Sequence, residues 1–409
     1  MIRFPGLVPW IAPSAAHLPE LRIQICEQAT NPLFTNTFLM RIKLRGCPLL
    51  PIPGTPAGEV TDLDVVCSQV LATCELRRVS QAQLYWADED MTSLALAAAA
   101  VPTREPVRAR RMPAETGLMM FAQPIGDVDM TLSTAVTGPW STAVPGLDDE
   151  LRMVSMIVAV SWSRWSPADL DIVNMPIRWR MNAHNGDTTP LPYNLQGIWL
   201  TFWTTVRMGW DGLPADKPIK VDRRTGKTST AADMAAREAL STAADLMPHS
   251  EMLLRFDQPL PDPGPDARDQ WAHVVYTAWQ LMAQSGANQL TETETVSRAR
   301  PGLRRDQRAH IRGPGSVQLV RVHTRHRPPA QASVEDAAAS HGRRAPQWTR
   351  RWPVRPYRRN TCLNPYAHAD GGCEHEERVV PAHIRGPADK PLVVTKRVHV
   401  WDTPPPSES

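Results

Sequence analysis

Three apolar runs rich in β-branched and aromatic residues set the strongest limit on how this chain can fold. They span Gly117 to Ile125, Val154 to Trp165 and Gly197 to Val206, and Gly, Pro or Asn residues bound them. Side chains of these types favour the pleated surface of a sheet, whereas the flanking residues favour turns. The runs therefore predict central strands of a single β-sheet.

Helical periodicity lies on either side of these strands. Apolar residues recur at three- and four-residue spacing from Glu59 to Ala100, which predicts helix over that range with Thr61 or Asp62 as its N-cap. The same period from Trp271 to Met282, with Gly286 beyond it, predicts a helix that packs on the sheet. Together these elements indicate the α+β class, a central β-sheet with packed helices.

Weaker patterns occur in four other segments. The polar, Ala-rich stretch from Thr228 to Met247 predicts a surface helix. The segment Asp222 to Thr230 contains Gly-Lys-Thr, but Val221 stands where a phosphate-binding loop needs its first glycine, which favours a turn followed by a helix cap. Near the N-terminus, Arg22 to Glu27 and Phe38 to Arg45 are interpreted as short strands.

Proline clusters and low-complexity sequence indicate how the chain is divided. The chain has 40 prolines, many of them clustered, and fixed φ angles with missing N–H donors prevent regular structure there. The predicted organisation is an irregular N-terminal segment (1–58), an α+β domain (59–326), a linker (327–342), a small basic β-rich tail module (343–401) and a disordered C-terminus (402–409).

Charge is distributed very unevenly along the chain. Between Arg298 and Asn360 there are sixteen Arg, no Lys and three acidic residues, so this segment carries +13 and the rest −10 within a net charge of +3. Such asymmetry indicates a polyanionic partner for the basic part, or docking of the basic part on the acidic part. Arginine suits bidentate phosphate contacts and stacking on bases. A GC-rich genome would also enrich Arg without any function.

The tail sets aromatic residues among its arginines. Aromatic rings can stack on unpaired bases while Arg neutralises phosphates, and each stack contributes about 1–3 kcal/mol. Packing of the Trp side on the main domain, with a solvated Arg side, is the alternative interpretation, and both stay open. The candidate nucleic-acid-binding residues are Arg312, Arg350, Arg351, Trp352, Arg355, Tyr357, Arg358, Arg359 and Arg385.

The hexapeptide Ala-His-Ile-Arg-Gly-Pro occurs twice, at Ala309 to Pro314 and at Ala382 to Pro387. Gly313 and Gly386 can take the positive φ that a tight turn requires, and a β-branched run follows each copy. We therefore expect two equivalent turns, each introducing a basic strand and each presenting its Arg to an anion. Chance recurrence in a chain rich in Ala, Arg and Pro is the alternative.

Signatures of catalysis and of metal binding are weak. The chain has no Gly-x-Ser-x-Gly and no His-Glu-x-x-His motif, so no catalytic residue is assigned. Cys362, Cys373 and His375 are ligand types that zinc prefers, but only Cys373 and His375 are close in sequence. This spacing favours a loop without metal, so we expect no cofactor and keep zinc as the alternative.

Cysteine usage and hydropathy indicate the compartment. The six cysteines are sparse and irregularly spaced, which argues against a secreted disulfide framework. No apolar stretch approaches the roughly 18 residues that span a bilayer. We therefore expect a soluble cytoplasmic protein without membrane contact.

Three places in the chain are similar to a family of uncharacterised proteins of actinobacteria and their phages. They are the helical run "AQLYWADEDMTSLALAAAA", the strands "ETGLMMFAQPIG", "AVSWS" and "WLTFWTT", and the tail motifs "WTRRWPV", "PAHIRGP" and "VHVW". The likeness extends from Val79 to Trp401, and the tail is its most specific part. The chain departs from the family pattern at "RPYRR" and in the Cys- and His-rich insert "CLNPYAHADGGCEHEE". The resemblance implies the order of elements, an actinobacterial or actinophage origin and a cytoplasmic location, but no activity.

The leading functional hypothesis from the sequence is a nucleic-acid-binding accessory protein of a mobile element, a phage or an actinobacterial host. In this hypothesis the basic aromatic tail contacts phosphates and bases. Two alternatives stay open: a protein-interaction module that uses exposed Trp residues, and an enzyme with a site between the sheet and the helix at Trp271 to Met282.

Overall fold

The three-dimensional description comes from a computed structural model of the chain. The structure describes residues 2–3, 11–28, 32–43, 47–53, 62–100, 105–131, 137, 141–147, 151–169, 171–172, 175–182, 188–205, 210, 213–240, 246–264, 267–285, 289–323, 349–354, 357–362, 375–380, 383–387 and 390. The linker predicted at 327–342 and the predicted C-terminus at 402–409 lie outside these ranges, so both stay predictions.

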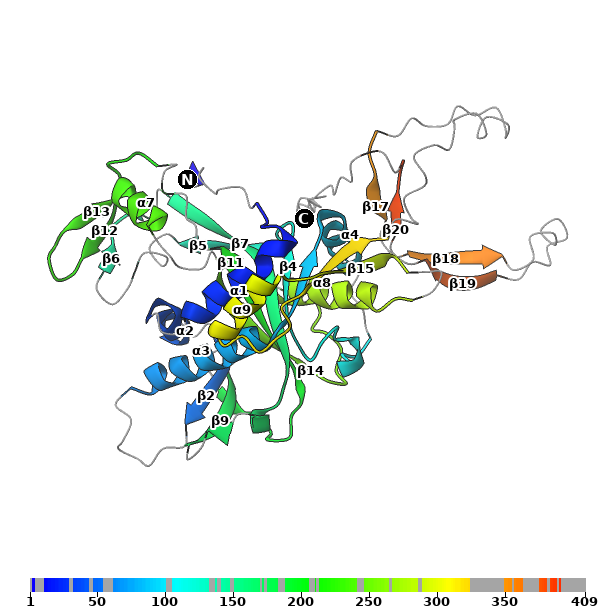
Figure 1. The fold of residues 1–409 in the computed structure, drawn as a ribbon, viewed down its shortest axis with the longest axis horizontal. Helices are drawn as coiled ribbons and strands as arrows, with labels where there is room; N and C mark the ends of the chain where they lie inside the picture. Colours follow the sequence, from blue (N-terminus) through cyan, green and yellow to red (C-terminus); the bar gives the residue numbers. More distant parts are fainter. Residues whose placement is uncertain are drawn as a thin grey trace, which may run out of the picture.

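A mixed β-sheet forms the centre of the molecule (Figure 1). Its path runs β14-β11-β7-β4-β3-β16-β15, and β1 and β5 also pair with β7, which makes nine strands in the part that the structure describes. β3 runs parallel to β4 and β16, whereas the other pairings on the path are antiparallel. The strands are β1 (Ile2–Arg3), β3 (Gln83–Ala87), β4 (Thr116–Phe121), β5 (Gly126–Thr131), β7 (Leu151–Trp165), β11 (Gly197–Thr205), β14 (Leu246–Arg255), β15 (Thr291–Val296) and β16 (Val317–Val322).

The three apolar runs of the sequence are β4, β7 and β11, which lie inside this sheet, so the prediction of central strands and of the α+β class is confirmed. Their residues alternate between two separate hydrophobic clusters. On β4, Met119 and Phe121 belong to one cluster, and Leu118 and Met120 belong to the other. Because both faces are covered, these strands need apolar side chains at nearly every position.

Five helices cover the two faces of the sheet (Figure 1). On one face lie α1 (Leu18–Glu27), α2 (Pro32–Lys43) and α3 (Leu63–Gln81). On the other lie α4 (Glu89–Ala99) and α8 (Ala267–Met282). Short 3-10 turns occur at η1 (Ala15–His17), η3 (Ala109–Arg111) and η4 (Pro167–Asp169).

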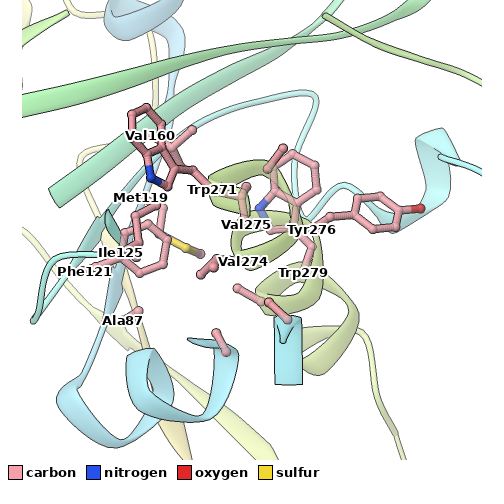
Figure 2. Close-up of a cluster of buried hydrophobic side chains, with 14 of the residues drawn as sticks. Ala87, Met119, Phe121, Ile125, Val160, Trp271, Val274, Val275, Tyr276 and Trp279 are labelled. Atoms are coloured by element: carbon pink, nitrogen blue, oxygen red, sulfur yellow. The ribbon is translucent and has the colours of Figure 1, made fainter. Parts of the chain in front are cut away.

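The helix predicted to pack on the sheet does so as α8. Figure 2 shows Trp271, Val274 and Val275 of α8 facing Met119 and Val160 of the sheet. All five side chains are at most 3 % exposed. The space between α8 and the sheet is therefore filled with packed apolar side chains along this stretch.

Two predictions of local structure are wrong. Arg22 to Glu27 and Phe38 to Arg45 were expected as strands, but the described residues of both belong to helices α1 and α2. In α1 the buried apolar residues Leu18, Leu21 and Ile25 recur at three- and four-residue spacing, a period that a six-residue window is too short to show. Residues 1–58 are therefore not irregular where they are described, and their helices contribute to the core.

The helix predicted from Glu59 to Ala100 is interrupted by a strand. Asp62 caps α3 by accepting hydrogen bonds from the N–H groups of Asp64 and Val65, as predicted. The chain then enters β3, where Leu84 and Tyr85 point into the two opposite clusters. Side chains that point alternately to opposite faces are a property of strands. The strand went unpredicted because it is short and the helical pattern continues on both sides of it.

A buried polar network joins α3 to the sheet. The Glu75 carboxylate accepts hydrogen bonds from Ser161 Oγ (2.5 Å) and Thr201 Oγ1 (2.6 Å) and pairs with the Arg78 guanidinium. Arg78 Nε in turn donates to Ser163 Oγ at 3.0 Å. Glu75 is 1 % exposed, so every one of these partners compensates for water that the carboxylate has lost.

Smaller sheets extend from this body. A lobe with its own core (Leu147, Trp210, Ile219 and Ala231) contains β6 (Ser141–Ala143), β12 (Pro218–Asp222), β13 (Thr228–Thr230) and α7 (Ala231–Ala239). A second sheet pairs β2 (Leu49–Pro53), β8 (Asp171–Ile172), β9 (Met175–Asn182) and β10 (Thr188–Pro190).

The Gly-Lys-Thr segment is a turn followed by a helix cap, as the sequence favoured. Gly226 has φ +68°, and Asp222 Oδ1 accepts hydrogen bonds from the N–H groups of Arg224 and Thr225. Thr230 caps α7 in a capping box with Asp233. The predicted surface helix is thus present in part, as α7; the first residues of the predicted range, Thr228–Thr230, form β13, and the last, Leu246 and Met247, begin β14.

In the tail, β17 (Trp352–Val354) pairs with β20 (His383–Arg385), and β18 (Tyr357–Cys362) pairs with β19 (His375–Val380). β17 packs against α4, and Ile384 packs against the cluster beneath it. Across the described helices, none is long and apolar enough to cross a membrane.

Candidate nucleic-acid interface

The most basic part of the main body is the helix α9 (Arg300–Arg308) and the turn after it. Arg300, Arg304 and Arg308 are spaced four residues apart, which places them along one side of the helix. All three are exposed, as is Arg312 in the turn. The sequence analysis assigned no structure to residues 300–308 and included only Arg312 among the candidates. The four-residue spacing was the signal that could have identified the others.

A buried ionic cluster attaches α9 to the body. Asp306 is 5 % exposed, and its carboxylate lies 2.9 Å from Arg298 Nε and 4.0 Å from Arg22 Nη2. Burial raises the pKa of the Asp306 carboxyl above its ordinary value, with Arg298 and Arg22 opposing that shift. On the adjoining helix α1, Glu20 Oε1 lies 3.0 Å from Arg298 Nη2 and 2.8 Å from Arg305 Nη2. The carboxylates of Asp306 and Glu20 are therefore already paired with arginines of this cluster.

The remaining arginines of α9 have no such neighbours. No ion pair within the described ranges involves Arg300, Arg304, Arg308 or Arg312. A surface hollow is lined by Pro301, Arg304, Gln307 and Arg308, which puts two guanidinium groups and an amide around one depression. Such a set offers several N–H donors to a phosphate group. We call the surface formed by Arg300, Arg304, Arg308 and Arg312 the arginine face.

The first copy of the repeated hexapeptide ends α9 and orients Arg312. Ala309 is the C-cap of the helix, and His310 has φ +56°. The backbone N–H groups of Arg312 and Gly313 both donate to the carbonyl oxygen of Ser80 at the end of α3, at 2.9 and 2.8 Å. The backbone at Arg312 is thus bound to α3 while its side chain stays exposed.

The second copy has a different structure, so the expectation of two equivalent turns is wrong. His383–Arg385 is a strand, β20, and Gly386 after it has φ +107°. Gly313 does not have a positive φ. The same letters therefore form a helix cap in one place and a strand end in the other, because the neighbouring elements differ: α9 precedes the first copy and β17 pairs with the second.

Of the candidate residues in the tail, one contacts the main body and others are exposed. Arg351 Nη2 lies 3.4 Å from Asp90 Oδ2 in the first turn of α4, and its Nε donates to the carbonyl oxygen of Lys390 at 2.7 Å. Its side chain is only 12 % exposed, so this arginine holds the tail against α4. Arg350 and Arg385 are exposed, and Trp352 is half-buried.

The other tail candidates are placed only in part. Tyr357, Arg358 and Arg359 belong to β18, which pairs with Val380, Val379 and Arg378 of β19. Arg355 lies outside the described residues. These positions stay predictions as contacts for nucleic acid.

Among the candidates with a described environment, Arg312 does not share a continuous surface with those of the tail. Arg312 lies beside α3, on the face that α1 and α9 share, whereas β17 and β20 lie beside α4, which covers the other face (Figure 1). Residues that are 38 positions apart in sequence, such as Arg312 and Arg350, were grouped by charge alone. The sheet between them separates the two sets.

The weak zinc candidates are only partly placed. Cys362 and His375 are partners across the β18–β19 ladder, and Cys373 lies outside the described residues. Within the ranges that the structure describes, no group of three or more His, Cys, Asp or Glu residues could hold a metal ion.

A buried histidine lies outside both basic regions. His249 is on β14, and its Nδ1 is buried without a hydrogen-bond partner. Burial, together with the positive charges of Arg41 and Arg268, lowers the pKa of this imidazole from 6.5 to about 4. Arg41 itself pairs with Glu251 on the same strand as the histidine. His249 is therefore neutral in the folded protein at neutral pH.

We expect this histidine to make the fold sensitive to acid. As pH falls through 6.5 the unfolded chain binds a proton at His249, whereas the folded chain does so only near pH 4, so the stability present above pH 6.5 is lost as the pH falls. Between pH 7 and pH 5 the free energy of unfolding should fall by about 1–2 kcal/mol more in the natural protein than in His249→Gln. Urea denaturation at both pH values measures this, and an equal fall in both proteins would contradict it.

The tryptophans bear on the alternative of a protein-interaction module, which stays a prediction because Trp10, Trp140, Trp348 and Trp401 lie outside the described residues. Of the 14 Trp residues, those with a described environment are either buried or half-buried, and none is exposed. The eight buried ones are Trp162, Trp165, Trp179, Trp199, Trp203, Trp210, Trp271 and Trp279. These eight tryptophans are part of the core, whereas Trp86 and Trp352 are half-buried.

Known proteins add no further information about this site. No family model matches the chain. No curated protein and no solved structure matches it at a significant level. Function is therefore inferred from the chain's own residues and their geometry.

Proposed function

We propose that this protein binds nucleic acid through the arginine face, as a nucleic-acid-binding accessory protein. The observation that carries the proposal is the set of four exposed arginines without an ion-pair partner in the described part of the chain. A guanidinium group forms bidentate hydrogen bonds with phosphate oxygens, and release of counterions from the nucleic acid drives such binding.

The attachment of α9 to the main body supports the proposal. Arg298, Arg22 and Glu20 fix the buried side of the helix through the cluster around Asp306, so α9 has a defined position. A helix that already has a fixed position loses little conformational entropy when a ligand binds, so the entropic cost of binding is smaller. The cluster around Asp306 thus favours contact between α9 and a regular array of phosphates over a loose electrostatic association.

The proposed binding mode does not read sequence. Phosphate contacts position a protein on nucleic acid but carry no sequence information of their own. We therefore expect similar affinity for oligonucleotides of different sequence. The tail, with Arg350 and Arg385 exposed, is a second and separate contact candidate on the other side of the sheet.

A cytoplasmic location belongs to the same proposal. Four cysteines have a described side-chain environment, Cys26, Cys47, Cys67 and Cys74; all four are free thiols, and Cys47 and Cys67 are buried. Free buried thiols are usual in a reducing compartment, where nucleic acid is also accessible. The origin in a mobile element, a phage or an actinobacterial host also remains a proposal, supported by the tail motifs.

Salt dependence tests the arginine face. Binding of labelled single- and double-stranded oligonucleotides is measured by fluorescence anisotropy from about 50 to 400 mM salt, and log affinity should fall steeply with log salt. Arg304→Gln with Arg308→Gln should flatten this slope by about one unit for each phosphate that the variant no longer neutralises, because fewer counterions are released.

The matched control is Arg223→Gln with Arg224→Gln, which removes the same charge from an exposed turn of the small lobe. This control should leave the slope nearly unchanged. Arg350→Gln with Arg385→Gln reports whether the tail contributes. Absence of binding at low salt, or an equal reduction of the slope in the lobe control and the α9 variant, would reject the arginine face as the interface.

A further inference from the structure

A second feature of the molecule is a pocket at the C-terminal end of α8, remote from the arginine face. It encloses about 320 Å³ between the sheet, α8 and the segment at η3. The sheet contributes Gln83, Tyr85, Thr293 and Gln318, which lie on β3, β15 and β16. The remaining walls are Arg110, Arg111, Met112, Pro113, Trp279, Met282 and Ala283.

The charge of this pocket is positive. Arg110 and Arg111 stand next to each other on η3, and no carboxylate lines the pocket. Arg111 has one partner, Glu105, at 3.3 Å, while no ion pair of Arg110 occurs among the described residues. At least one guanidinium group is therefore available to an incoming anion.

An unpaired donor lies in the pocket wall. Trp279 is fully buried, and its Nε1–H has no hydrogen-bond partner in the described structure. A buried donor left without an acceptor has lost its hydration without replacement. Its neighbour Tyr85 differs, because the Tyr85 hydroxyl donates to the carbonyl oxygen of Pro113 at 3.0 Å. Trp279 lines the pocket, so the resonance of its indole N–H reports on what binds there.

The rest of the lining selects for an apolar ligand body. Met112, Pro113 and Met282 contribute apolar surface, and Gln83, Thr293 and Gln318 contribute neutral polar groups. Sites of this size usually combine an apolar lining with a few polar groups that orient the ligand. The lining contains no His, Cys, Ser, Asp or Glu, and its hydroxyl groups are those of Thr293 and of Tyr85, which already donates to Pro113.

We propose that this pocket binds a small organic anion, with its charged group at Arg110 and Arg111 and a flat apolar body against Met112, Pro113 and Met282. The anionic group is a carboxylate or a phosphate ester, since the planar fork of Arg matches both. The site is independent of nucleic-acid binding by α9, because it lies at the opposite face of the sheet.

The test follows the indole N–H resonance of Trp279 in the ¹H–¹⁵N spectrum of the full chain, assigned by its loss in Trp279→Phe. The probes are benzoate, phenyl phosphate and the uncharged benzamide. Benzoate or phenyl phosphate should shift this resonance saturably, and whichever binds more tightly identifies the anionic group. Benzamide, which has the same shape but no charge, should bind at least about tenfold more weakly.

Arg110→Gln should weaken binding of the preferred anion by about tenfold or more, because it removes a charge-assisted hydrogen bond. Arg110 is exposed, so this variant should fold normally, and its other indole resonances verify that. Arg224→Gln, on the small lobe, should bind as the natural protein does. The proposal is overturned if neither anion gives a saturable shift up to about 10 mM, if benzamide binds equally well, or if Arg110→Gln has no effect.

Discussion

Glu75→Ala is expected to lower the free energy of unfolding by about 3–5 kcal/mol. The substitution removes the acceptor of Ser161 and Thr201 and leaves the guanidinium of Arg78 buried without its carboxylate. An uncompensated buried charge costs far more than the original pair contributes, because the lost hydration is not replaced. Urea denaturation at neutral pH measures the change.

The effect should extend to two tryptophans of the core. Trp203 Nε1 donates to Ser161 Oγ at 3.0 Å, and Trp199 Nε1 donates to Thr201 Oγ1 at 3.1 Å. Both hydroxyls lose their own acceptor in the variant. Gln69→Ala, at an exposed position on the same helix, is the matched control and should change stability by no more than about 0.5 kcal/mol. A loss below about 1 kcal/mol in Glu75→Ala would mean that water replaces the carboxylate.

Gly313→Ala is expected to lower the free energy of unfolding by about 1–3 kcal/mol and to weaken nucleic-acid binding together with it. A Cβ at this position would lie 2.5 Å from the carbonyl oxygen of Ala82 and 2.7 Å from that of Gln81. Both atoms belong to the backbone, which cannot rotate away as a side chain can. The turn must therefore separate from α3, and the arginine face moves with it.

Gly264→Ala is the control for this change, since its Cβ would approach no atom closer than 3.4 Å. We expect that variant to have the stability of the natural protein within about 0.5 kcal/mol. Gly313→Ala is compared with it by urea denaturation and by oligonucleotide anisotropy. If Gly313→Ala were as stable as the control, the close approach of this turn to α3 would be wrong.

The sequence by itself determined the elements whose environment is uniform. β4, β7 and β11 are apolar at nearly every position because helices cover both faces of the sheet, and that burial is visible as composition. α8 is also predictable, because apolar residues recur at helical spacing from Trp271 to Met282. Shorter elements were predicted wrongly: β3, of five residues, was expected as helix, and parts of α1 and α2 were expected as strand. A short window holds too few periods to separate the two spacings.

The candidate nucleic-acid interface was likewise predictable only in part from the sequence. The sequence shows which third of the chain is basic, and Arg312 was among the candidates taken from it. It does not show which arginines form ion pairs within the folded protein. Arg351 pairs with Asp90, about 260 positions earlier, and Arg298 pairs with Glu20 near the N-terminus. Only the tertiary structure brings these charges together. An arginine's availability depends on which carboxylates lie within a few ångströms, and the chain path between them, not local sequence, sets that distance.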